Sequence, residues 1–160
     1  MTTFLLTAVA GFIATGVMSG VLFLIQWRGL ANADMINAVG SLITRDEKNA
    51  LAPGLMIHFA SGILFAFIYV GAWSLWGFDS LKIYTLFGFL TGAAHGLVVS
   101  FILVALVAEH HPIEKFQSAG LGVAAAHWVG HVVYGLVVGG IAGMYALRYD
   151  FVPVLAQIPQ

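Results

Sequence analysis

Long uncharged blocks separated by short polar segments dominate the sequence. The blocks cover residues 1–27, 49–78, 83–108 and 116–147, and every charged side chain lies outside them. A helix that crosses the roughly 30 Å hydrocarbon core of a bilayer needs about 20 residues, so each block predicts one membrane-spanning helix. We place these helices at about residues 4–26, 53–76, 83–108 and 116–147. The chain is therefore predicted to be an all-α, polytopic membrane protein whose single membrane domain covers residues 1–160.

The connections between the blocks predict how the helices are arranged. The turn at residues 77–82 is short, so the second and third helices should be antiparallel neighbours in an antiparallel four-helix bundle. The connection at residues 27–52 is the only long one. Apolar positions recur in it at helical spacing, which predicts a short amphipathic helix in the membrane interface; they are Met35, Ile36, Val39, Leu42 and Ile43.

Composition agrees with this class and excludes several others. Hydrophobic residues make up 61% of the chain and charged residues only 8%, which is far from a soluble protein and makes the lipid bilayer the first partner. The formal net charge of -1 gives no reason to expect a nucleic-acid partner. Because there is no cysteine, disulfides, thiolate metal sites and iron–sulfur clusters are excluded.

Glycines recur at four-residue steps in the last two predicted helices. Gly88, Gly92 and Gly96 form one series, and Gly135, Gly139 and Gly143 form the other. Small residues at this spacing let another helix approach closely. The two grooves predict tight helix packing, either within the chain, with other membrane subunits or by self-association.

Four histidines lie inside the uncharged blocks: His58, His95, His127 and His131. From the rise of a helix, His95 and His131 should both lie about 21–24 Å from the same membrane face. His127 should lie one turn closer to that face, and His58 should enter from the same side. These imidazoles could therefore line one cavity that opens toward the long connection, with Tyr69 and Tyr134 lying deeper. We interpret His110 and His111 as interfacial loop residues.

An ionisable side chain inside a membrane is a functional hypothesis by default. Neutral imidazole is the commonest metal ligand, so all four histidines are candidate ligands of copper, iron or zinc. His95 and His131 on facing helices could instead bind a haem b axially. Two other interpretations stay open: a histidine-lined path for a transported species, and hydrogen bonding that only holds the helices together.

The functional hypotheses belong to three classes. The first is a subunit of a larger membrane complex, with or without a histidine-bound metal or haem. The second is a small transporter or channel with a histidine-lined path. The third is an intramembrane metal-dependent enzyme, although we do not expect an enzyme by itself, because no carboxylate lies inside the blocks to build an acid/base pair or a serine triad.

Two motifs carry a resemblance to a known family. Residues 10–19 read Ala-Gly-Phe-Ile-Ala-Thr-Gly-Val-Met-Ser, and residues 131–135 read His-Val-Val-Tyr-Gly. The chain thereby resembles small four-helix bacterial inner-membrane proteins of unknown function, with an A-G-x-x-A-T-x-x-M-S first helix and an H-x-x-Y-G last helix. The resemblance implies the four-helix fold and a bacterial inner membrane, and it implies no mechanism. His127 stands where the family pattern has alanine.

The basic residues predict an orientation. Arg28, Arg45, Lys48 and Lys115 lie on the side of the long connection, against Lys82 and Arg148 on the other. The excess of Lys and Arg in cytoplasmic loops then places the long connection in the cytoplasm and both termini outside.

Overall fold

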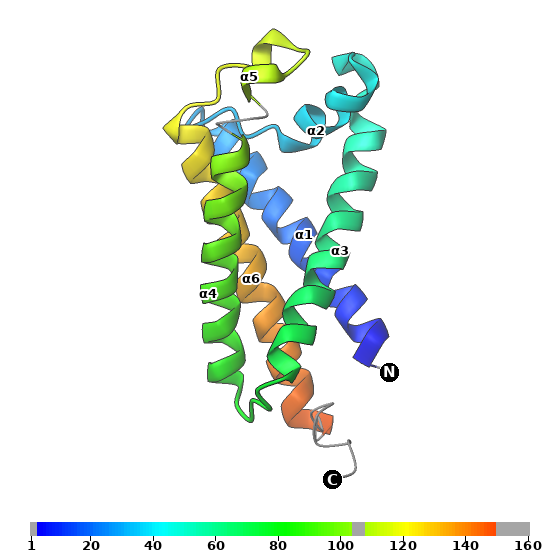
Figure 1. Ribbon diagram of the computed structural model, residues 1–160, viewed down its shortest axis with the longest axis vertical. Coiled ribbons are helices and arrows are strands. Elements are labelled where there is room, and N and C mark those ends of the chain that lie inside the picture. The colour runs from blue at the N-terminus through cyan, green and yellow to red at the C-terminus, as the bar shows by residue number, and fades with distance from the viewer. Residues whose placement is uncertain (1–2, 104–107, 150–160) are drawn as a thin grey trace.

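Four long helices build the molecule, and a computed structural model describes them over residues 3–103 and 108–149 (Figure 1). They are α1 (Thr3–Trp27), α3 (Leu51–Ser74), α4 (Leu81–Ile102) and α6 (Leu121–Tyr149). Each of the four is long and apolar enough to cross a membrane, and no strand occurs in the described ranges. The prediction of an all-helical protein with four membrane-length helices is confirmed.

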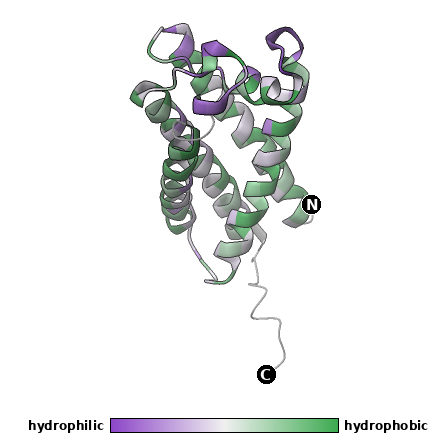
Figure 2. Cartoon of the chain, turned by 45° about the horizontal axis from the view of Figure 1, so that its top comes forward, coloured by the Kyte–Doolittle hydropathy of each residue, from purple (hydrophilic) through white to green (hydrophobic). Residues whose placement is uncertain are grey.

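Short helices fill the connections on one side of the molecule. They are α2 (Met35–Thr44), η1 (Glu47–Asn49), α5 (Ala108–His110) and η3 (Glu114–Phe116). In Figure 1 the chain rises through α1 to these elements, descends through α3, rises through α4 and descends through α6. We call residues 28–50 and 108–120 together the cap. Hydrophilic residues gather in the cap, while apolar residues cover the long helices (Figure 2).

Two of the predicted helix boundaries lie in the cap. The last helix was predicted from residue 116, but α6 begins at Leu121, where the Gly120 carbonyl accepts the first N–H bonds of the helix. Phe116 belongs to η3 and is buried in the cap, so its apolar side chain is satisfied without extending the helix. The third helix was predicted to residue 108. Residues 104–107 of that prediction lie outside the described residues.

Polar contacts hold the cap together. Asp34 caps the N-terminus of α2 by accepting from the backbone N–H of Asn37, and it also lies 3.5 Å from the Lys115 ammonium. Lys115 bonds to Glu47 as well. The hydrogen bond with Glu47, helped by the nearby Asp34 charge, raises the pKa of Lys115 above its usual value. One lysine therefore ties the connection before α6 to both ends of the long connection.

Glycine makes α4 and α6 the closest pair of helices. A Cβ at Gly92 would lie 2.5 Å from the His131 carbonyl oxygen, and one at Gly96 would lie 2.8 Å from the His131 Cβ. Gly88, Gly135 and Gly139 meet the facing backbone in the same way. The two predicted glycine grooves thus pack against each other, so they are occupied within the chain.

The helices α3 and α4 are not packed along their length. Helix α1 packs on both α3 and α6, and α4 packs on α6, but α3 and α4 make few close contacts. In Figure 1 they diverge from their connecting turn toward the cap. The short turn therefore does not make them close neighbours, because the glycines of α4 draw that helix onto α6 instead. The divergence leaves the space in which the histidines lie.

Candidate functional site

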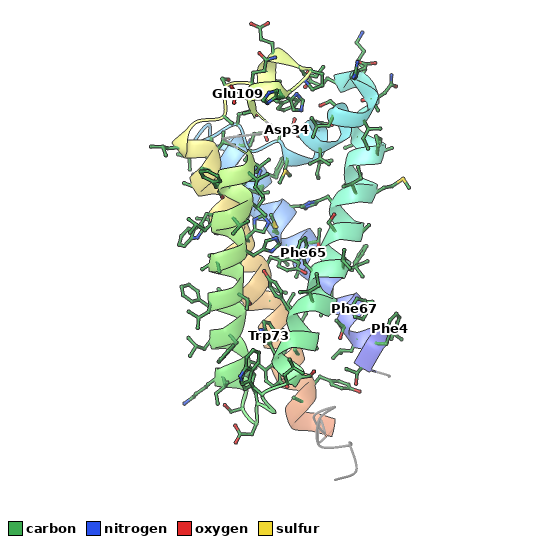
Figure 3. The ribbon with its side chains drawn as sticks, in the orientation of Figure 1. Phe4, Asp34, Phe65, Phe67, Trp73 and Glu109 are labelled. Atoms are coloured by element: carbon green, nitrogen blue, oxygen red, sulfur yellow. The ribbon has the colours of Figure 1, made fainter. Side chains whose placement is uncertain are left out.

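A cavity of about 160 Å³ lies between α3 and α4, with α1 and α6 behind it and α2 above it. We call it the histidine cavity. Figure 3 shows Phe65 reaching from α3 into this space, where its ring centre lies 4.1 Å from that of His95 on α4. The cavity is lined by Thr15, Met18, Met35, Val39, Ile57, His58, Ser61, Gly62, Phe65, His95, Val99, His131 and Tyr134. Three of the four predicted histidines therefore share one cavity.

His95 and His131 lie at the same level, as the helix-rise estimate predicts. Their ring centres are 4.8 Å apart in an edge-to-face arrangement. Tyr69 stands beside them, with its hydroxyl 2.9 Å from Nδ1 of His95. Helices α3, α4 and α6 thus each contribute one ring to a single aromatic and imidazole cluster.

The hydrogen-bond partners of His131 and His58 fix which ring nitrogen carries the proton. Nδ1 of His131 lies 2.8 Å from the His127 carbonyl, and a carbonyl can only accept, so Nδ1 is the protonated nitrogen of the neutral ring. On α3, Nε2 of His58 lies 3.1 Å from the Ser19 hydroxyl oxygen. The Ser19 hydroxyl donates its own proton to the Thr15 carbonyl. Nε2 of His58 must therefore donate to the Ser19 oxygen, and Nδ1 of His58 is the unprotonated nitrogen.

Two hydroxyl groups of the lining behave in the same way. Thr15 donates to the Gly11 carbonyl at 2.7 Å, and Tyr134 donates to the Gly62 carbonyl at 2.5 Å. Their oxygens keep only lone pairs, like Nε2 of His131 and Nδ1 of His58. These four groups therefore offer hydrogen-bond acceptors, and the Ser61 hydroxyl also lines the cavity.

His95 is the exception, because its tautomer depends on Tyr69. The Tyr69 hydroxyl faces both Nδ1 of His95 and, at 3.3 Å, the Thr91 carbonyl. If its proton goes to Thr91, Nδ1 of His95 is protonated and Nε2 is an acceptor; if it goes to His95, Nε2 becomes a donor. Moving one phenolic proton therefore changes what His95 can present to the cavity.

His127 does not share the histidine cavity. Its Nδ1 donates to the Val123 carbonyl at 2.8 Å, and the side chain lines a separate cavity of about 40 Å³ beneath the cap. We call this the cap cavity; its polar lining residues are Asn32, Asp34, His111, Lys115, Ser118 and His127. The prediction of one cavity with four imidazoles is thus correct for three of them.

The arrangement does not fit the predicted cofactors. Among the described residues, no three side chains of histidine, aspartate or glutamate come close enough to hold one metal ion. A haem between His95 and His131 would have to lie between two rings, and rings in direct contact leave no room for it. Copper, iron, zinc and haem b are therefore not supported as ligands of this cluster.

Aromatic side chains close the histidine cavity on the side away from the cap. The Tyr69 ring packs edge-to-face on Tyr134 at 5.8 Å and lies 5.6 Å from Trp73, and Trp73 contacts Tyr84. All four rings are buried. This aromatic layer therefore bounds the cavity on the side away from the cap.

Two residues of the site escaped the sequence interpretation. His111 is fully buried: Nδ1 accepts from the Ile113 N–H, and Nε2 donates to the Ala38 carbonyl at 3.0 Å. Met35 lines the histidine cavity, the cap cavity and a third cavity of about 90 Å³ beside His58. Neither role leaves a local signal, because each depends on contacts between distant segments.

Comparison of the chain with protein-family models, with curated proteins and with solved structures finds no match. The resemblance to small four-helix bacterial inner-membrane proteins therefore stays a prediction, and the site has to be interpreted from its own chemistry.

Proposed function

We propose that the chain is an integral membrane protein whose four long helices cross the bilayer as an antiparallel bundle, with α2 lying in the interface. The support is the distribution of side chains. Large apolar residues such as Phe23, Leu64 and Phe101 are exposed on the long helices, where lipid tails would cover them. The charged residues of the cap and of the turn at residues 77–82 lie at opposite ends of the bundle.

Within this frame, the function favoured by the geometry is that of a small transporter with a histidine-lined path. The observation that carries it is the histidine cavity, in which His58, His131, Thr15 and Tyr134 direct lone pairs at one space inside an otherwise apolar bundle. Placing polar side chains in a membrane interior costs free energy, so such side chains commonly mark a substrate or ion pathway. Lone pairs without donors suit a ligand that supplies the donors.

The lining also limits the solute. Among the described residues, no aspartate, glutamate, lysine or arginine lines the cavity, so a bare ion would find no opposite charge to offset its desolvation. About 160 Å³ has room for a small molecule but not for a lipid headgroup with its chains. The transported species is therefore a small uncharged molecule rich in N–H or O–H groups, such as a short amide.

In this conformation the proposed path is open toward the cap and closed toward the opposite end of the bundle. The cap side reaches the cavity past Met35 and His58, whereas the layer of Tyr69, Trp73 and Tyr134 blocks the opposite side. Transport would need that layer to rearrange, as in alternating access. Breaking the Tyr134 bond to the Gly62 carbonyl would free α6 from α3 and open this layer.

Urea uptake into proteoliposomes tests the proposal. The purified chain should accelerate urea-driven swelling over protein-free vesicles, and His131→Leu, which removes one acceptor, should slow it by about fivefold, since a net hydrogen bond contributes about 1 kcal/mol. Leu97→Ala on the outward face of α4 is the matched control and should leave uptake unchanged. Equal swelling with and without protein would overturn the transport function.

The subunit of a larger membrane complex is the second candidate. Its support is the small extramembrane mass of the chain, which leaves little outside the bilayer for an independent activity. The glycine grooves of α4 and α6 fill each other, so a partner subunit would need another face. Co-purification of a stoichiometric membrane partner in mild detergent would favour this candidate over a transporter that acts alone.

A further inference from the structure

His127 has an unpartnered ring nitrogen beneath the cap, outside the histidine cavity. His127 is only 2% exposed, and its Nε2 has no hydrogen-bond partner among the described residues. Nδ1 of the same ring donates its proton to the Val123 carbonyl, so Nε2 of the neutral ring carries a lone pair. A buried acceptor without a donor has a free-energy cost, because it has given up its hydrogen bond to water. A bound donor would offset that cost.

The surroundings of His127 are built to hold such a donor. The ring lines the cap cavity of about 40 Å³. Since about 10–15 Å³ of such volume holds one water-sized group, the cavity has room for roughly three. The Asp34 carboxylate and the Asn32 amide line the same cavity and offer further oxygen acceptors. His111, also on its wall, is already paired on both nitrogens and offers nothing more.

The cap cavity adjoins the histidine cavity at one side chain. Met35 on α2 lines both, and a methionine is unbranched and adaptable enough to move aside. The His127 carbonyl also accepts the Nδ1 proton of His131, so the two rings are linked through one turn of α6. Beyond Met35 lies the histidine cavity, which His131 lines.

We propose that the cap cavity is a second solute site, in which Nε2 of His127 accepts a hydrogen bond from an N–H group of the solute before it passes Met35 into the histidine cavity. This rests on the proposed transport function for the identity of the solute, a small uncharged amide. It adds where that solute binds first and which side chain separates the two sites.

Solid-state NMR of the full chain in lipid bilayers, with ¹⁵N-labelled histidine rings and urea as the probe, tests the two sites separately. His127→Leu and His131→Leu assign the two Nε2 resonances. The expected result is that urea shifts both resonances in a saturable way. A shift of His131 alone, with His127 unchanged or bonded to water only, would overturn the cap site and leave the histidine cavity standing. A shift of His127 alone would support the cap site and count against the proposed function.

The absence of cysteine gives a second test, of Met35. Met35→Cys would place the only thiol of the chain at the boundary between the cavities. A water-soluble thiol reagent should label it. Because the adduct would fill the boundary between the cavities, it should abolish the urea shift of His131 while leaving that of His127. Labelling that leaves the His131 shift intact would show that Met35 does not separate the two sites.

Discussion

At the scale of single residues, one hydrogen bond joins two helices in the interior of this molecule. Tyr134 on α6 donates to the Gly62 carbonyl on α3, and few other direct links join these two helices. The bond lies at the bottom of the histidine cavity, beside the Tyr69 ring. Its loss should therefore affect both the stability of the bundle and the closure of the cavity.

Tyr134→Phe should lower the thermal stability of the detergent-solubilised protein, by about 0.5–1.5 kcal/mol for one buried hydrogen bond. Tyr84→Phe is the matched control: Tyr84 is equally buried, but its hydroxyl has no hydrogen-bond partner among the described residues. Similar losses in the two variants would show that the Tyr134 bond contributes nothing beyond packing.

Lys115 is the residue that should make cap stability depend on pH. Its folded pKa is raised, chiefly by the hydrogen bond with Glu47, so its contribution is fully present below the usual lysine value of 10.5 and is lost as pH rises through the folded value. The side chain is 43% exposed, so solvent screening limits the effect to about 0.2–1 kcal/mol. Thermal melts between neutral pH and strongly alkaline pH measure it.

Lys115→Gln should flatten that alkaline decline. Lys48→Gln, which removes a lysine that makes no ion pair in the described part of the chain, should keep it. If both variants decline as the parent does, another group titrates.

At the scale of elements, the contact between α4 and α6 is made by backbone on backbone. Gly92 admits no side chain, because a Cβ there would press on the His131 carbonyl and on Gly135. Gly140, on α6, has nothing within 4 Å of a would-be Cβ. The two glycines therefore differ in their surroundings and not in their position within a regular helix.

Gly92→Ala should destabilise the bundle by about 1–3 kcal/mol, since the two helices must separate to admit the methyl group. Gly140→Ala should be neutral or stabilising by up to about 1 kcal/mol, because alanine loses less conformational freedom in a helix than glycine does. Thermal stability of the two variants in one detergent decides the matter. Equal effects would mean that α4 and α6 are not in close contact.

For the whole molecule, the orientation in the membrane can be measured without background, because the chain has no cysteine. Lys48 in the cap and Lys82 at the opposite end are both exposed. With the cap in the cytoplasm, Lys82→Cys should react with an impermeant maleimide on intact cells, and Lys48→Cys should react only after permeabilisation. The reverse pattern would contradict the orientation proposed from the basic residues.

Much of the architecture could be predicted because it depends on local composition. A bilayer demands about 20 uncharged residues for each crossing, and the four blocks meet that demand without reference to one another. The common depth of His95 and His131 follows from the constant rise of a helix. Both predictions hold because neither requires knowing which helix packs on which.

Only the tertiary structure decided how the helices share their faces. The sequence by itself determined that α4 and α6 carry glycine grooves, but not that each groove fills the other and so moves α4 away from α3. That displacement creates the histidine cavity, gives His127 a separate cavity and buries His111 against α2. The physical reason is that a cavity is the space left after the helices have packed, and that space depends on every pair of helices at once.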